Sequence, residues 1–411
     1  MTSVSPFSIA VVGAGLGGLV LARVLQLHGV TVTVFEREPT SSSRGQGGSL
    51  DIHPESGQYA LKTAQLTAQF RKVARPEGEG TKITDKHGTV VFEDPAPEDP
   101  PSRDEQGPSR GDRPEVDRWQ LRQLLLDSLH PDTVHWEHRL ESAHFSDGNV
   151  KVSLTFTRSS SRKATFKFDV VVGADGTWSR TRQLLSPAQP TFTGVTFVEI
   201  QHALGNAASR AELATLVGHG SLFALGDSRG IIAQRNSGNV VRVYAAVRRP
   251  PDEFYEAAEE GEGAMRAAVL RHFDGWAPKL RGLIDAPGAK GFDVRPLSVL
   301  PSSHKWDTAP GGRATLLGDA AHLMVPFAGA GANLAMADGA DLGLALAKAK
   351  TPSELLERVR EYETAMQERA KGEWEKSMQN MDVFLSDSAP ASAVEKMKEL
   401  MAGGGPPQSQ H

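Results

Sequence analysis

The hydrophobic pattern changes from strand-like to helical and back within the first 36 residues. Apolar runs cover Ile9–Val12 and Val30–Phe35, and the apolar positions of Leu19–Leu27 between them recur at helical spacing. Four glycines lie in the turn 13–18, directly after the first run. This pattern predicts a strand, a glycine-rich turn, a helix and a second strand, which is the order of a β-α-β unit.

Farther along, the spacing predicts a helix over Gln58–Ala74 and a hairpin over Thr81–Phe92 with its turn at Asp85–Gly88. Proline, serine, glycine and acidic residues then predict a long loop over Glu93–Arg113. The next expected elements are a helix over 119–129 and strands over 150–156 and 165–172.

From residue 192 the apolar runs become short and frequent, which favours an antiparallel sheet. The expected strands cover 196–200, 221–225, 231–234 and 240–247. A helix over 257–273 and strands over 292–297 and 314–317 follow, and then a helix over 335–347. The last expected element is one long amphipathic helix over 353–385, whose apolar stripe would pack across the domains.

Composition removes several classes of chemistry. The chain has 411 residues, a net charge of −5 and no cysteine. Disulfides, thiolate metal sites and cysteine nucleophiles are therefore excluded, no metal site is expected, and redox chemistry would need a cofactor. The charge gives no reason to expect nucleic acid as a partner. No apolar run reaches the ~18 residues of a membrane span, and no basic leader precedes the first strand, so we expect a cytoplasmic protein without a membrane segment.

The first glycine turn has the features of a nucleotide site. Gly13 permits the tight turn, Gly15 lets the backbone approach a pyrophosphate, and Gly18 lets helix and strand pack without an intervening Cβ. The free N–H groups at the start of the helix would face the anion. Glu36 ends the second strand, where it would accept hydrogen bonds from a ribose diol and disfavour a 2′-phosphate.

Two later turns add to this prediction. The run Val170–Val172 ends in Gly173-Ala-Asp175-Gly176, and the strand over 314–317 ends in Gly318-Asp319. The loop after Asp319 contains a proline and two closely spaced glycines, so its backbone N–H groups can approach a flat anionic group. We expect Asp319 to accept a hydrogen bond from a ligand hydroxyl. His322 is expected to be a packed, hydrogen-bonded histidine rather than a catalytic base.

These three turns, in this order, resemble those of the single-component FAD-dependent aromatic hydroxylases, the class A flavoprotein monooxygenases. The ADP-binding turn of that family is similar to Gly13–Gly18 with Glu36, its second motif to Gly173–Arg180, and its third to Leu317–Gly331. The likeness spans about residues 7 to 380. Within the family, Gly47–Leu61 is similar to the tetracycline-inactivating members, as is the general layout of 307–326.

The resemblance implies an α/β fold with a Rossmann-like FAD-binding domain of the glutathione-reductase type, an inserted antiparallel β-sheet domain for the substrate, and a long C-terminal helix. We expect a monomer. The expected boundaries are 1–75, 112–190 and 291–340 for the FAD-binding domain, 76–111 and 191–290 for the substrate-binding domain, 341–390 for the bridging helix and 391–411 for a tail.

The resemblance also implies non-covalent FAD, with NADPH and O2 as co-substrates, and hydroxylation of an aromatic or polycyclic molecule through a flavin C4a-hydroperoxide. Because the cofactor carries this chemistry, no catalytic side chain is assigned. Transient NADPH contacts are expected from arginines such as Arg44, Arg180 and Arg182. The expected cofactor contacts are Gly13, Gly15, Gly17, Gly18, Glu36, Arg37, Arg44, Gly48, Arg118, Asp175, Asp319, Pro326, Gly329, Gly331, Ala332 and Asn333.

The expected substrate contacts are Glu199, Phe223, Arg229, Arg242, Pro326 and Phe327. Of the polar residues among them, only Arg229 matches the type found in the tetracycline-inactivating enzymes, so tetracyclines and other polycyclic or phenolic substrates both remain open. Two other functions also remain open: another flavin oxidoreductase, and a non-catalytic FAD-binding regulator that uses the helix over 353–385 as its interaction surface. The halogenase signature Trp-x-Trp-x-Ile-Pro does not occur in the sequence.

Overall fold

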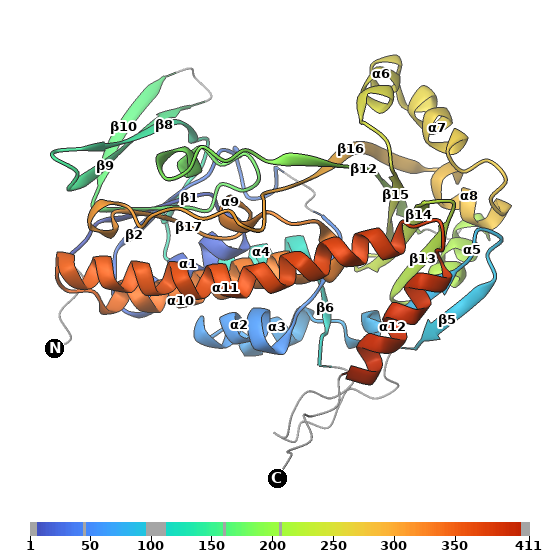
Figure 1. Ribbon diagram of the computed structural model, residues 1–411, viewed down its shortest axis with the longest axis horizontal. Coiled ribbons are helices and arrows are strands. Elements are labelled where there is room, and N and C mark those ends of the chain that lie inside the picture. Colours follow the sequence, from blue (N-terminus) through green and yellow to red (C-terminus); the bar gives the residue numbers. More distant parts are fainter. Residues whose placement is uncertain (1–5, 44–46, 96–111, 159–161, 205–207, 404–411) are drawn as a thin grey trace, which may run out of the picture. The chain divides into compact units, whose positions relative to one another are not determined.

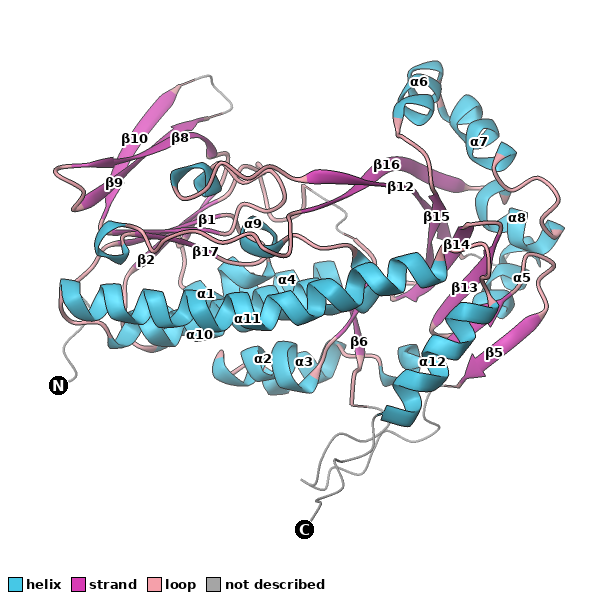
Figure 2. Cartoon of the chain, viewed as in Figure 1, coloured by secondary structure: helices cyan, strands magenta, loops and turns pink. Residues whose placement is uncertain are grey.

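The computed structural model describes residues 6–43, 47–95, 112–158, 162–204 and 208–403. They form a mixed α/β chain (Figures 1 and 2) that divides into two compact units. Unit 1 comprises Met1–Ala74, Val116–Thr191 and Ser298–Ser377, and unit 2 comprises Arg75–Glu115, Phe192–Leu297 and Met378–His411. Each unit is thus assembled from three separate stretches of sequence.

The core of unit 1 is a five-stranded parallel sheet in the order β17-β11-β1-β2-β7. Its strands are rich in valine and isoleucine and almost entirely buried, as expected for a parallel sheet covered on both faces. The first predicted strands and helix are confirmed. The strands are β1 (Ile9–Val12), β2 (Val32–Phe35), β7 (Val134–His135), β11 (Val170–Gly173) and β17 (Ala314–Leu316).

Two long helices pack closely in unit 1 because glycines line their crossing. A Cβ on Gly17 of α1 (Leu16–Leu27) would lie 2.3 Å from the Ala335 carbonyl oxygen of α10 (Ala330–Lys348), and one on Gly339 would lie 2.3 Å from the Gly17 carbonyl oxygen. The other elements of this unit are β3 (Ser49–Asp51), η1 (Pro54–Gln58), α2 (Tyr59–Thr63), α3 (Thr67–Val73), α4 (Arg118–Asp127), η3 (Thr181–Leu184), η4 (Pro310–Gly312), α9 (Asp319–His322) and η5 (Pro326–Ala328), while β6 (Glu115–Asp117) spans the unit boundary.

Two predictions in unit 1 are wrong in detail. The expected strand over 165–172 is two strands, because the chain leaves a three-stranded antiparallel sheet and enters the parallel sheet at Asp169, whose Oδ2 accepts from the Ser8 N–H (2.9 Å). The expected helix over 58–74 is divided into α2 and α3 by a turn in which Gln65 has a φ of 59°. The three-stranded sheet consists of β8 (Arg139–Ser146), β9 (Lys151–Thr157) and β10 (Lys163–Phe168).

Unit 2 contains a seven-stranded sheet in the order β16-β12-β15-β14-β13-β4-β5. The predicted hairpin and the predicted antiparallel strands are confirmed, except that β13 and β4 pair in parallel. The strands are β4 (Thr81–Thr84), β5 (Val90–Asp94), β12 (Thr191–Ala203), β13 (Ser221–Gly226), β14 (Arg229–Asn236), β15 (Val240–Val247) and β16 (Ala289–Val299).

Helices cover one face of this sheet with a continuous apolar core. The expected single helix over 257–273 is two helices, because Gly261 with a φ of 110° interrupts it. Helices α5 and α8 were not predicted from the sequence. The four helices are α5 (Ala208–Val217), α6 (Asp252–Glu260), α7 (Glu262–Arg271) and α8 (Pro278–Asp285).

In the C-terminal part, one prediction is confirmed and one is wrong. The long helix is confirmed as α11 (Pro352–Phe384). The expected tail from residue 391 is instead a helix, α12 (Ala391–Gly403), in which Ala393 is fully buried. Outside the described residues lie 404–411, Arg44 and most of the loop expected over Glu93–Arg113.

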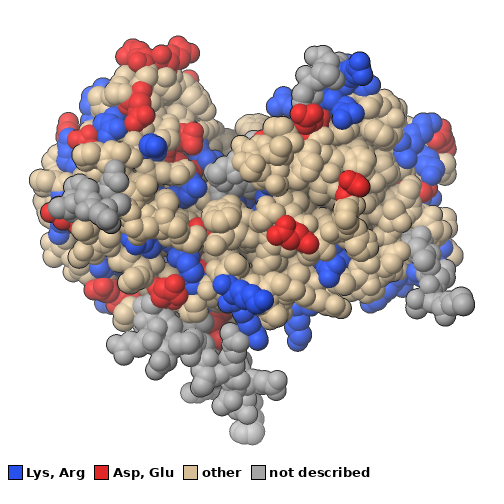
Figure 3. Space-filling model, turned by 180° about the vertical axis from the view of Figure 1, so that it is seen from behind, with Lys and Arg blue, Asp and Glu red and all other residues tan. Residues whose placement is uncertain are grey.

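Within the described ranges, no helix combines the length and the apolar character that crossing a bilayer would require. On the face of the molecule seen in Figure 3, acidic and basic side chains are interspersed.

Candidate functional site

Four turns meet at the carboxyl edge of the parallel sheet in unit 1. The Gly13 N–H donates to the Phe35 carbonyl and the Ala174 N–H to the Val12 carbonyl, both at 2.8 Å. The Leu317 N–H donates to the Gly173 carbonyl at 3.0 Å. The three sequence motifs are therefore hydrogen-bonded neighbours, at the edge where parallel α/β sheets bind ligands.

The glycines of the first turn have two different functions. A Cβ on Gly13, which has a φ of 110°, would lie 2.2 Å from the Ala174 carbonyl oxygen, and one on Gly18 would lie 2.3 Å from the Gly13 carbonyl oxygen. A Cβ on Gly15 would meet no heavy atom of the described residues within 4 Å. Packing thus requires Gly13 and Gly18, while Gly15 faces open space where a ligand can approach the backbone.

Helices α1 and α10 both begin at a glycine and have no side-chain cap. The first N–H groups of each helix lack intrahelical acceptors and carry the positive end of the helix dipole. In the first turn of α10, Gly331 faces open space in the same way as Gly15. Two sets of backbone donors in unit 1 are therefore suited to anionic or carbonyl groups of a dinucleotide.

Glu36 holds the glycine turn in place. Its Oε2 accepts from the Ala14 N–H (2.8 Å) and its Oε1 from the Glu38 N–H (3.0 Å). On the other side of the turn, the buried Arg122 donates through Nε to the Ala14 carbonyl oxygen (2.9 Å). Arg122 was not among the residues predicted for this site, although its place on the buried side of a predicted helix is a usable signal. Arg37 is exposed and lies 3.6 Å from the Glu38 carboxylate.

Gly48 and Arg118, two of the expected cofactor contacts, are hydrogen-bonded neighbours. The Arg118 N–H donates to the Gly48 carbonyl oxygen at 3.3 Å. A Cβ on Gly47 would lie 2.9 Å from Cδ of Arg118, so the arginine stem packs directly on this backbone.

The Asp175 carboxylate closes its own turn. Its Oδ1 accepts from the Ser179 hydroxyl (2.5 Å), and its Oδ2 accepts from the N–H groups of Arg180 (2.9 Å) and Thr181 (3.1 Å). The expectation that Arg182 meets NADPH at the surface is wrong: this side chain is buried and donates to three backbone carbonyls, those of Thr177, Ala188 and Ala320. It therefore ties the second motif to the third.

Asp319, in the third motif, and Asn333, two residues after its end, differ in burial and in hydrogen bonding. Asp319 is exposed at the start of α9, and its carboxylate makes no hydrogen bond within the part of the chain that the structure describes. Asn333 is buried; its Nδ2 donates to the carbonyls of Asp51 (2.8 Å) and Gly329 (3.0 Å), and its Oδ1 accepts from the His53 N–H (2.9 Å). Asn333 thus holds the backbone around a helix start, and Asp319 remains available to a ligand.

The other expected contacts of this motif lie around the start of α10. Pro326 is exposed and Phe327 is half-buried, both in η5, and Ala332 is half-buried in the first turn of α10. Gly329 has a φ of 64° and precedes that turn.

His322 is a buried, paired histidine, as expected. Its Nε2 lies 2.6 Å from Oδ2 of Asp338, and its side chain is 9 % exposed. Burial lowers the pKa of His322, but the charge and hydrogen bond of Asp338 outweigh burial and raise it above its ordinary value. Burial likewise raises the pKa of Asp338, and His322 and Arg369 reverse this and lower it. The close contact thus favours the charged form of each partner.

In unit 2, the residues of the sheet face opposite the helices are mostly aromatic or polar. The strand register places Glu199, Tyr244, Ile232 and Phe223 in one row across four strands. Their sequence neighbours point to the other face and form the apolar core beneath α5–α8. The aromatic ring of Phe197 lies 5.8 Å from that of Tyr244.

A buried carboxylate on this face is shared by two arginines. Glu199, 2 % exposed, pairs with Nη1 of the buried Arg242, and its Oε2 lies 2.5 Å from Nε of Arg295, whose side chain is 49 % exposed. Arg295 was missed in the sequence analysis because its pairing depends on the register of β12 and β16. The expected substrate residue Arg229 lies elsewhere: it donates to the His272 and Asp227 carbonyls, on the helix-covered side.

Proteins with similar sequences identify the family of this chain. The family model for an FAD binding domain matches residues 7–374. Monooxygenase penA of Penicillium thymicola is 30 % identical over 439 aligned residues, which cover 94 % of this chain and 98 % of the relative. The chain is an FAD-dependent monooxygenase of this family. The resemblance seen in the three motifs is thereby confirmed, and the named relatives favour the enzyme over a non-catalytic regulator.

Two solved structures show the same fold. Klebsiella pneumoniae HpxO, crystallised with FAD and uric acid, has a TM-score of 0.71 and 20 % identity, covering 96 % of this chain and 92 % of that one. The tetracycline destructase Tet(51) has a TM-score of 0.69 and 18 % identity, covering 98 % and 96 %. At these identities the two structures show that the monooxygenase shares their fold.

Proposed function

We propose that this monooxygenase uses NADPH and O2 to hydroxylate an aromatic or polycyclic small molecule. The observation that carries the proposal is the open Gly15 at the uncapped start of α1, with the exposed Asp319 on the same sheet edge. Bound FAD supplies the redox and oxygen chemistry, so the protein has to hold it, exclude water and align the substrate.

Different residues at the sheet edge would contact different parts of FAD. The N–H groups after Gly15 would bind the pyrophosphate, and Asp319 would accept from a ribityl or ribose hydroxyl. Glu36 would use its remaining acceptor positions for the adenosine ribose, and Arg118 would contact the phosphate or ribityl region. The first turn of α10, from Gly329 to Ala332, would place its N–H groups at the carbonyl edge of the isoalloxazine. With no cysteine in the chain, FAD would be held without a covalent bond.

At the level of architecture, we propose that unit 1 is an FAD-binding domain of the glutathione-reductase type and that unit 2 is an inserted substrate domain. The row from Glu199 to Phe223 supports this second role, because it presents aromatic rings next to a charged cluster on one sheet face. A planar substrate with a polar or ionised oxygen fits such a face. Two arginines facing the single Glu199 carboxylate leave one positive charge in excess, and Arg295 is the half-exposed member.

The test is NADPH oxidation by the purified, FAD-loaded enzyme against a panel of polycyclic phenols that includes tetracycline. We expect at least one compound to stimulate oxidation and to gain one oxygen atom from ¹⁸O2, detected by mass spectrometry. The apoprotein without added FAD is the negative control, and NADH in place of NADPH tests the nicotinamide preference. Stimulated oxidation that yields only hydrogen peroxide, with every compound recovered unchanged, would contradict hydroxylation.

A further inference from the structure

A charged network inside unit 1 is attached directly to the turn that carries Asp319. Its centre is Asp338 on α10, which is fully buried. Oδ2 of Asp338 accepts from the Gly318 N–H (3.0 Å) and from Nε2 of His322 (2.6 Å). Its Oδ1 accepts from Nη2 of Arg369 on α11 (2.9 Å). A buried carboxylate is retained at low cost only when it is paired and hydrogen-bonded in this way.

The network continues to a second carboxylate one helical turn away. Nη1 of Arg369 donates to Oδ2 of Asp341 (2.9 Å), and the Tyr59 hydroxyl donates to Oδ1 of Asp341 (2.8 Å). One arginine thus bridges two aspartates on the same helix. Asp338 contacts the Gly318 turn, whereas the described bonds of Asp341 go to Arg369 and Tyr59.

The turn that Asp338 holds has an unusual conformation. Gly318 has a φ of 58° and a ψ of −143°, and a Cβ there would lie 2.9 Å from the Ala335 Cβ. Its carbonyl accepts from the N–H groups of Ala321 and His322, which close the first turn of α9. Because Asp319 follows Gly318 directly, a change in the orientation of the peptide that Asp338 binds would shift the Asp319 backbone and with it the exposed carboxylate.

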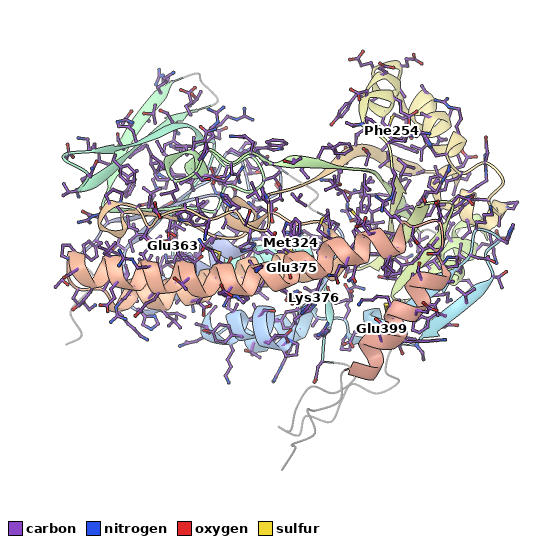
Figure 4. The ribbon with its side chains drawn as sticks, in the orientation of Figure 1. Phe254, Met324, Glu363, Glu375, Lys376 and Glu399 are labelled. Atoms are coloured by element: carbon purple, nitrogen blue, oxygen red, sulfur yellow. The ribbon has the colours of Figure 1, made fainter. Side chains whose placement is uncertain are left out.

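Helix α11 holds the strand that leads into this turn. The Tyr362 hydroxyl donates to the Leu316 carbonyl (2.9 Å), and Oε1 of Glu363 accepts from the Thr315 hydroxyl (2.7 Å). Glu363 lies on α11 near the middle of unit 1 (Figure 4). The strand β17 and the Gly318 turn are thus both hydrogen-bonded to buried polar groups rather than only packed.

We propose that Asp338 is a positioning residue for the cofactor: through the Gly318 N–H and His322 it fixes the turn that presents the Asp319 carboxylate to FAD. This inference rests on the proposed role of Asp319. Asp338 acts through the turn, so its loss should weaken FAD binding only as far as Asp319 contributes to that binding.

The test compares Asp338→Asn with Asp341→Asn. Both substitutions remove one negative charge from α10 and one ion pair with Arg369, but only the first changes the contact with the Gly318 turn. We expect Asp338→Asn to raise the Kd of the apoprotein for FAD about tenfold or more, and Asp341→Asn to change it less than about twofold. Kd is measured by quenching of flavin fluorescence, and thermal unfolding of each apoprotein reports its stability.

A double variant distinguishes a positioning role of Asp338, which acts through Asp319, from a general loss of packing in the fold. In Asp319→Ala/Asp338→Asn, the Kd should equal that of Asp319→Ala alone, because Asp338 acts through Asp319. A general loss of packing would instead weaken binding additively. If Asp338→Asn does not fold, His322→Gln takes its place in the same comparison, and there an unchanged Kd would overturn the proposal.

Three further outcomes overturn it: equal Kd changes in the two single variants, additive changes in the double variant, or an unchanged Kd in Asp338→Asn. If Asp319→Ala weakens FAD binding and Asp338→Asn does not, only the positioning role fails. If neither variant weakens binding, the proposed role of Asp319 fails as well.

Discussion

The carboxyl edge of the sheet in unit 1, where we propose that FAD binds (the cofactor edge), differs in construction from the face of the unit 2 sheet that lies opposite the helices. At the cofactor edge, the polar side chains of the motifs bind the protein itself: Glu36 holds the glycine turn, Asp175 closes its own turn, and Asn333 clamps the start of α10. We propose that backbone N–H groups and Asp319 bind the ligand. On the face in unit 2, side chains form the surface, with Glu199 shared between two arginines.

This difference has a physical consequence. A site made of backbone donors depends on a few glycines and on buried supports, and it suits any ligand with the same phosphate and carbonyl groups. A site made of side chains on a sheet can change with each strand residue, while the core on the other face is preserved. The first kind is suited to a cofactor common to a family, and the second to a substrate that differs among its members.

The largest expected effect, on stability, distinguishes a glycine that packing requires from a glycine that leaves room for a ligand. Gly13→Ala should lower the free energy of unfolding of the apoprotein by about 4 kcal/mol or more and abolish FAD retention, because its Cβ would strike the Ala174 carbonyl. Gly15→Ala, at an open position with a φ of −78°, should leave apoprotein stability within about 0.5 kcal/mol and still weaken FAD binding. Urea unfolding and flavin titration measure both. Equal destabilisation by the two variants would remove the distinction.

The second-largest effect on stability is expected in the cluster of Glu199, Arg242 and Arg295 in unit 2. Arg242→Ala should cost about 3 kcal/mol of stability, because it takes one partner from a buried carboxylate. Arg295→Ala removes a half-exposed partner, so it should cost less than about 1 kcal/mol and act mainly by raising KM for the substrate. Both variants should retain FAD. Loss of FAD from either one would contradict the proposal that these arginines act on the substrate and not on the cofactor.

Asp319→Ala should have a smaller effect that is confined to the cofactor. The exposed carboxylate makes no hydrogen bond within the described residues, so its removal should leave apoprotein stability unchanged. FAD binding should weaken by about 2 kcal/mol, the value of a hydrogen bond to a charged group. Equilibrium dialysis with FAD gives the affinity. Asp319→Asn, which retains an acceptor oxygen, should recover part of it, and full affinity in the alanine variant would exclude this contact.

The smallest effects are those of pH, and two neighbouring histidines should act with opposite sign. The pKa of His322 is raised, so its contribution to stability is complete below its ordinary value of 6.5 and is lost as the pH rises through the folded-state pKa. Burial lowers the pKa of His304, so its contribution is present above 6.5 and is lost as the pH falls.

Urea unfolding between about pH 5 and 9 distinguishes the contributions of the two histidines to stability. His322→Gln should reduce the loss of stability on the alkaline side, and His304→Gln should reduce it on the acid side. Acid-side changes in both variants would show that the His322–Asp338 pair is not an ion pair near neutral pH.

Much of the architecture could be predicted from the sequence because it depends on local pattern. The β-α-β unit, the hairpin of unit 2 and the long helix α11 all follow from periodicity and turn residues. The local pattern did not predict the structure where long-range contacts decide it. At Asp169 the chain passes from one sheet to another while its apolar pattern continues. The segment from residue 391 forms α12, although a tail was expected. The positions of individual side chains in the site were the least predictable.

By itself, the sequence determined the family, the cofactor and the order of the motifs, because glycines and short strands act on the backbone within a few residues of each other. The tertiary structure decided which side chains of the motifs stay exposed and which hold the backbone. It buried Asn333, engaged Asp175 in its own turn and left Asp319 exposed. It also placed Arg229 on the helix-covered side of its sheet and Asp338 beneath the Gly318 turn. Those outcomes depend on strand register and helix crossing, which join residues far apart in the chain.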